Sequence, residues 1–145
     1  MSESVELEQQ EDFRFTIRFG DSIPVLAADE SPPLGNGAGP TPVQLLAAAV
    51  GNCLSDSLLF ALRKFKQAPE PIRAVVEASV GRNPQNRLRV QRIGVRITLG
   101  VPASSLQHLD RALGQFEAFC TVAQSVGQGI DIEVAVYDST GVRLK

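Results

Sequence analysis

Apolar residues follow one another almost without interruption from Leu45 to Leu62. Just before this run, Thr41 can accept the free N–H groups of a helix start, Pro42 suits the first helical position, and Gln44 completes a capping box. The run ends on basic side chains that suit the negative pole of a helix dipole, namely Arg63, Lys64 and Lys66. The pattern predicts one long, mostly buried helix within residues 39–66.

Apolar and polar residues alternate, as is typical of half-buried strands, in the segments 13–18, 88–99 and 130–136, and strands are also predicted for 23–28 and 72–80. A Gly20-Asp21 turn joins the first two of these segments, which predicts a hairpin. In the segment 88–99 the apolar positions change from even to odd numbers near Gln91 and Arg92, which predicts a β-bulge there.

A second helix is predicted from Ser104 or Ser105, because apolar residues then recur at intervals of three and four: Leu106, Leu109, Ala112, Leu113 and Phe116. A short helical segment with Cys120 near its start precedes the last strand. The order of elements indicates an α+β fold. We expect residues 1–12 to be a flexible acidic tail and residues 13–145 to form one domain.

The long helix is apolar on almost every side, and the remaining short elements supply little cover for it. A monomer of 145 residues would therefore leave part of this helix in water. Packing two such helices together in an obligate homodimer would remove the difficulty.

Composition excludes several classes of function. A net charge of −2 gives no field that attracts nucleic acid or an anionic membrane, and the arginines of the segment 82–96 have no interleaved aromatic residues, so we interpret them as a solvated sheet face. One histidine, His108, cannot supply a zinc ligand set, and no metal or cofactor is expected. The acidic start lacks a signal peptide, and the long helix carries too many polar groups to span a bilayer, so we expect a cytoplasmic protein.

Cys53 and Cys120 are the two cysteines, and both could be inert buried residues, which is the usual role of such side chains. Cys53 lies roughly 18 Å from the start of its helix, too far for the dipole to activate it. Its helical neighbours are apolar on one side and polar on the other, as in a pocket. At Cys120, a helix start would favour a thiolate. If the fold brings the two sulfurs together, a thiolate could attack a peroxide and the resulting sulfenic acid could condense with the other thiol.

The chain resembles the OsmC/Ohr family. The resemblance rests on Asp29-Glu30, on residues 39–42 (GPTP), on the alanine-rich segment that leads to Gly51-Asn52-Cys53, and on residues 119–122 (FCTV), and it covers nearly the whole chain from Phe13. It implies an intertwined α+β homodimer whose long helices pack against antiparallel sheets, with sites at the subunit interface.

The resemblance also implies a thiol peroxidase that reduces organic hydroperoxides in the response to oxidative or osmotic stress and is itself restored by a small dithiol. Cys53 would be the nucleophile and Cys120 the resolving thiol, assisted by an arginine of the N-terminal strands, for which Arg18 or Arg14 is the candidate. The family's glutamate after the helix-starting proline is replaced by Val43. A valine cannot hold an arginine beside a thiol, so the alternative is a dimer that binds a small ligand, or serves a structural role, without peroxidase activity.

Overall fold

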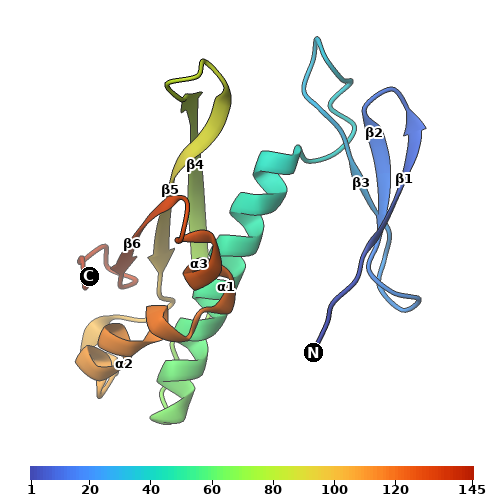
Figure 1. The fold of residues 1–145 in the computed structure, drawn as a ribbon. Coiled ribbons are helices and arrows are strands. Elements are labelled where there is room, and N and C mark those ends of the chain that lie inside the picture. Colours follow the sequence, from blue (N-terminus) through green and yellow to red (C-terminus); the bar gives the residue numbers. More distant parts are fainter. The chain divides into compact units, whose positions relative to one another are not determined.

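The structure is a computed structural model that describes residues 1–145, and the chain packs as two compact units, Met1–Leu46 and Ala47–Lys145. The α+β class is confirmed: strands come first, a long helix follows, and further strands enclose a second helical region (Figure 1). The single domain expected over residues 13–145 stays a prediction.

The N-terminal unit is a three-stranded antiparallel sheet of β1 (Glu6–Glu11), β2 (Arg14–Arg18) and β3 (Leu26–Ala28), in that order. The predicted hairpin is present as the β2–β3 pair. Part of the segment expected to be a flexible tail pairs as β1, because Leu7 lies opposite the buried Ile17 and acidic residues of β1 lie opposite the two arginines of β2.

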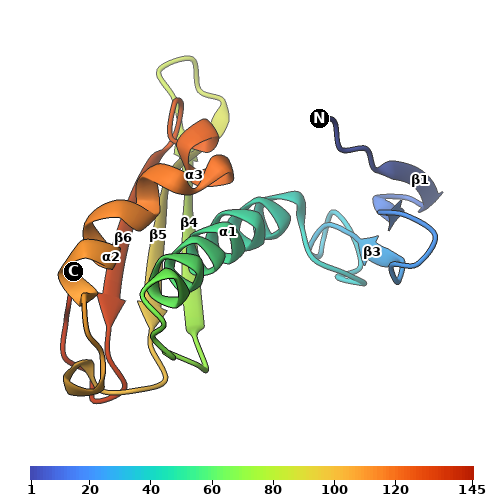
Figure 2. The same ribbon diagram turned by 90° about the horizontal axis from the view of Figure 1, so that it is seen from below.

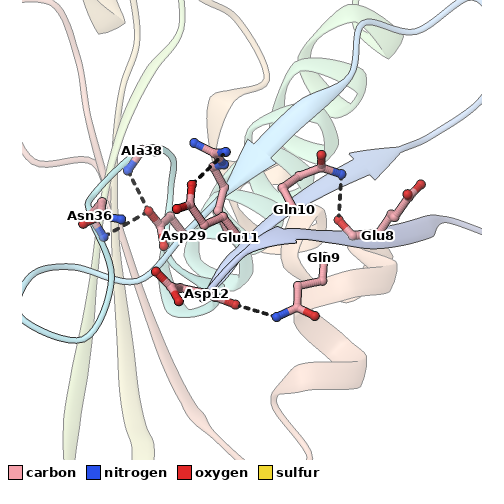
Figure 3. A network of polar contacts seen from close by, with 9 residues as sticks. Glu8, Gln9, Gln10, Glu11, Asp12, Asp29, Asn36 and Ala38 are labelled. Carbon is pink, nitrogen blue, oxygen red and sulfur yellow. Dashed lines mark hydrogen bonds and ion pairs between the residues drawn. The ribbon is translucent and has the colours of Figure 1, made fainter.

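Asp29 organises the loop between β3 and the long helix. Its buried carboxylate accepts backbone N–H groups of Glu30 at 2.8 Å and of Asn36 and Ala38 at 3.1 Å (Figure 3). The hydrogen bond from Ala38 is the main reason that the pKa of Asp29 lies below its ordinary value. A Cβ at Gly35 would lie 2.5 Å from the Asp29 Oδ1 atom, so a larger residue would displace this carboxylate.

The long helix α1 spans Pro42–Lys64 and begins with the predicted capping box. The backbone N–H of Gln44 donates to Thr41 Oγ1 at 3.2 Å, and Gln44 Oε1 accepts the Thr41 N–H at 2.9 Å. One face of α1 is buried in the C-terminal unit, through residues that include Leu54, Leu58 and Leu62. The other side chains of the helix are half-buried or exposed, and Phe60 is 73% accessible.

By length and composition α1 could cross a membrane, contrary to the expectation that its polar groups exclude this. The core helix of a soluble protein meets the same criteria, so the finding is weak evidence for a membrane span.

The C-terminal unit contains a sheet of β4 (Arg73–Arg82), β5 (Leu88–Thr98) and β6 (Asp131–Tyr137), in that order. The bulge predicted near Gln91 is confirmed: Ser79 pairs with Arg92 and Val80 with Val90, which leaves Gln91 as the extra residue. The β4–β5 pair is antiparallel, but β6 runs parallel to β5, so the expectation of antiparallel sheets is wrong for this pair. The reason is the long helical connection, which returns the chain to the same end of the sheet.

Helical segments connect β5 to β6: η1 (Ala103–Ser105), α2 (Leu109–Gln115), η2 (Phe116–Phe119) and α3 (Thr121–Val126). The predicted continuous helix from Ser104 or Ser105 is therefore wrong. His108 takes a left-handed conformation with φ 58° and separates η1 from α2. Helices α1, α2 and α3 cover one face of the sheet (Figure 2), the face that carries the buried side chains Ile93, Val95 and Ile97.

Candidate functional site

An apolar pocket of about 430 Å³ lies between α1 and the segment from α2 to α3, all within the C-terminal unit. This volume is within the range of small-molecule sites. The pocket is lined by Cys53, Asp56, Ser57, Phe60, Ala61, Lys64, Phe65, Gln115, Phe119 and Thr121. One of the two cysteines therefore faces an open, mostly apolar cavity.

Cys53 reaches the pocket from the middle of α1, where its side chain is half-buried. The polar residues beside it are fixed within the helix: Asn52 donates to Asp56 Oδ2 at 3.1 Å, and Ser55 donates to the Gly51 carbonyl at 2.8 Å. Gly51 is required at its position because a Cβ there would lie 2.3 Å from Val76 Cγ2 on β4. Helix α1 thus packs closely on the sheet two residues before Cys53.

Cys120 is fully buried and is the N-cap of α3, as the predicted helix start required. Its sulfur accepts the backbone N–H of Ala123 at 3.4 Å. The helix start acts in the predicted direction, since this N–H lowers the pKa of the Cys120 thiol, but it is not the largest effect. Burial raises the pKa of the Cys120 thiol to about 11 and outweighs the opposing effect of the Ala123 N–H.

The two cysteines, 67 positions apart in the sequence, lie close enough for Cys53 to raise the pKa of Cys120. Both thiols are free. Ser57, one of the polar helical neighbours of Cys53, also lies close enough to Cys120 to lower the pKa of that thiol. Its position one turn after Cys53 was the available signal.

Three phenylalanines form the apolar walls, and the sequence did not mark the last two as site residues: Phe60, Phe65 and Phe119. Phe65 is held by two neighbours, since its ring stacks on His108 with centroids 5.0 Å apart and Arg111 lies 5.5 Å from the ring centroid. Phe119 is 75% exposed although it precedes the fully buried Cys120. His108 is exposed and supports the pocket wall indirectly.

Arg18 and Val43 belong to the N-terminal unit. Arg18 is exposed on β2, opposite Glu6, and its proposed assistance to Cys53 stays a prediction. Val43 lies in the first turn of α1, which contains no acidic residue. No group of three or more histidine, cysteine, aspartate or glutamate side chains is arranged to hold a metal ion.

We expect Cys53→Ser to lower the pKa of Cys120 from about 11 while leaving it above 9.0, because the effect of Cys53 is lost but burial remains. The folded-state pKa exceeds the unfolded one, so the protonated thiol stabilises the fold fully below about pH 9, and this contribution is lost as the pH rises through about 11. The measurement is the rate at which Cys120 is alkylated in the folded protein at different pH values. Mass spectrometry of the peptide that contains Cys120 gives this rate. Identical profiles in the wild type and the variant would contradict the closeness of the two thiols.

Comparison with known proteins places the chain in context. A family model described as OsmC-like protein matches residues 35–135. A search of curated protein sequences finds no match. Among solved structures, an OsmC-like protein of unknown function from Vibrio cholerae has a TM-score of 0.79 at 19% identity, and the match covers 94% of this chain and 99% of that one.

Two further similar structures are described as organic hydroperoxide resistance proteins. The one from Legionella pneumophila, called OsmC, has a TM-score of 0.70 at 15% identity and covers 94% of this chain and 96% of its own. The one from Elizabethkingia anophelis, with thiocyanate bound, has a TM-score of 0.74 at 11% identity and covers 96% and 97%. At these identities the likeness shows the fold.

Proposed function

The chain belongs to the family of OsmC-like proteins, and from this premise we propose that it is a homodimeric thiol peroxidase that reduces organic hydroperoxides with Cys53 and Cys120. One observation carries the proposal: Cys53 lines an apolar pocket and lies close enough to the distant Cys120 to raise its pKa. Two proteins of the same fold are described as organic hydroperoxide resistance proteins, which supports the choice of substrate.

Cys53 is the attacking thiol because it faces the pocket, whereas Cys120 is buried with a pKa of about 11 and stays protonated at neutral pH. The Cys53 thiolate attacks the terminal oxygen of the hydroperoxide, the O–O bond breaks, and the alkoxide leaves and takes up a proton as an alcohol. Cys53 is then a sulfenic acid, oxidised by two electrons.

Cys120 completes the cycle. Its sulfur attacks the Cys53 sulfenic sulfur and releases water, which forms a disulfide between the two residues. Two features favour this step: the Ser57 hydroxyl and the Ala123 N–H both stabilise the developing Cys120 thiolate. A small dithiol then reduces the disulfide and returns both thiols.

The apolar surface of α1 and η2 supports a homodimer. Phe60 and Phe119 are 73% and 75% exposed, and large exposed apolar side chains of this kind mark contact surfaces. A second copy of the chain would cover them, and residues 13–145 would then act as one domain within the dimer. We place this dimer in the cytoplasm, where thiols are kept reduced.

A second candidate function is favoured by Val43. The first turn of α1 has no carboxylate that could hold an arginine near Cys53. The same dimer would then retain apolar small ligands in the pocket without reducing peroxides, or would have a structural role. This candidate predicts ligand binding that is unaffected by Cys53→Ser.

The test of the peroxidase is direct. We expect one equivalent of cumene hydroperoxide to consume both free thiols of each chain and to leave a Cys53–Cys120 disulfide, detected by thiol titration and peptide mass spectrometry. A dithiol such as dithiothreitol is expected to restore them. Thiols that survive millimolar hydroperoxide would exclude the peroxidase and leave the ligand-binding function.

A further inference from the structure

Lys145 joins the segment that follows β6 to the helical region that carries Cys120. Its backbone is fixed beside β6, because the Val136 N–H donates to the Lys145 carbonyl at 3.0 Å. Its ammonium donates to the Leu113 carbonyl at 2.7 Å, forms an ion pair with Glu117, and lies 5.2 Å from the Phe116 ring centroid. One side chain therefore contacts both α2 and η2.

Glu117 connects this contact to Cys120. Its carbonyl accepts the Cys120 N–H at 3.2 Å and the Gln124 side-chain amide at 3.0 Å. Cys120 is the residue at which η2 ends and α3 begins. Glu117 is thus bonded through its carboxylate to Lys145, and through its carbonyl to Cys120 and α3.

The ion pair of Lys145 and Glu117 is more protected from water than the others in the protein. The two side chains are 35% and 34% exposed, whereas every partner in the other three ion pairs is at least 41% exposed. A partly buried pair is screened less than an exposed one and fixes its two side chains more firmly.

The segment that follows β6 does not need the Lys145 ammonium for its own attachment. The buried Asp138 carboxylate accepts the backbone N–H groups of Thr140 at 2.9 Å and of Val142 at 3.0 Å. What the Lys145 side chain adds is a fixed position for α2 and η2, which lead directly to Cys120.

We propose that Lys145 is a positioning residue for Cys120: through Glu117, its ammonium fixes the turn from which the Cys120 sulfur reaches Cys53. This role rests on the proposed function and concerns its second step. There the Cys120 sulfur bonds to the Cys53 sulfenic sulfur, the Cys53 S–O bond breaks, and the hydroxyl group leaves as water with the Cys120 proton. Lys145 does not line the pocket, so the attack of Cys53 on the hydroperoxide should not depend on it.

The two steps can be timed separately. Reduced protein is mixed with cumene hydroperoxide and quenched with dimedone, and mass spectrometry separates the dimedone adduct of the Cys53 sulfenic acid from the disulfide. Lys145→Met keeps an apolar stem of similar length without the ammonium. We expect unchanged consumption of hydroperoxide and closure of the disulfide about tenfold slower, because small displacements of a reacting group are costly in rate.

Three further variants show whether the ion pair is the cause. Lys145→Arg should retain most of the wild-type closure rate, and Glu117→Gln should slow closure as Lys145→Met does. Both changes together should slow it no more than the slower single variant, since they remove one interaction. Lys66→Gln removes an exposed lysine that does not line the pocket, and as the matched control it should leave both steps unchanged.

A second oxidant separates this role from the peroxidase. Diamide adds to one thiol and is displaced as its hydrazine by the other, so it closes the Cys53–Cys120 disulfide without a peroxide. If only diamide reacts and its closure step depends on Lys145, the positioning role stands and the peroxidase is excluded. If hydroperoxide reacts but closure is equally fast in the wild type and Lys145→Met, the positioning role is wrong and the peroxidase stands. Equal slowing of both steps, equal effects of Lys145→Met and Lys66→Gln, or no closure of the wild type with either oxidant would also overturn the positioning role.

Discussion

Replacing Cys53 by serine is expected to slow the oxidation of the protein by cumene hydroperoxide by at least about a hundredfold. Serine occupies the same space in α1 but its hydroxyl is not ionised, so the peroxide oxygen meets no nucleophile. Cys120 cannot take over, since it is fully buried and burial raises its pKa to about 11. The measurement is the rate of free-thiol loss under excess hydroperoxide, followed by peptide mass spectrometry.

Cys120→Ser is the matched control because it removes the second sulfur and leaves the pocket residue in place. We expect this variant to react with hydroperoxide at nearly the wild-type rate, to accumulate a Cys53 sulfenic acid that dimedone traps, and to form no intramolecular disulfide. If Cys120 is oxidised in Cys53→Ser as fast as in the wild type, the assigned order of attack is wrong.

The sequence patterns correctly predicted the structural elements that are determined by interactions between residues close together in the chain. The capping box of Thr41 and Gln44 fixes the start of α1 through hydrogen bonds over three residues, so the sequence contains all of the information. The bulge at Gln91 follows from a phase change within one strand. By contrast, the parallel pairing of β6 with β5 depends on how the intervening helices return the chain, which no strand pattern records.

The same distinction holds for the second helical region. The apolar spacing from Leu106 to Phe116 predicted a continuous helix, but His108 adopts a left-handed conformation that interrupts it. Its ring then stacks on Phe65, at the end of α1 and 43 positions away. Tertiary contact thus accompanies a break that helix propensity did not predict.

For the candidate site, spacing and resemblance selected Cys53 and Cys120, and their closeness required the fold. At Cys120 the helix start is visible in the sequence, whereas the complete burial of the side chain is not. Burial is the larger effect on its pKa. Phe65 and Phe119 were missed because they have no polar chemistry that marks them.

Phe116→Ala is expected to lower the free energy of unfolding by about 3–5 kcal/mol, the usual cost of removing a buried aromatic side chain. Phe116 is fully buried at the junction of α2 and η2, and the Lys145 Nζ atom lies 5.2 Å from its ring centroid. The variant loses apolar burial and leaves a cavity in the core of the C-terminal unit. Urea unfolding followed by circular dichroism measures the shift in midpoint at unchanged slope.

Phe119→Ala provides the comparison, because it makes the same substitution three residues later in the same 3₁₀ segment at a side chain that is 75% exposed. In a single protomer, this substitution should lower the free energy of unfolding by less than about 0.5 kcal/mol. If a second copy covers Phe119, the loss of stability in Phe119→Ala will instead depend on protein concentration. The loss of stability in Phe116→Ala will persist at every concentration. Equal and concentration-independent losses of unfolding free energy in the two variants would contradict the assignment of Phe116 to the buried core.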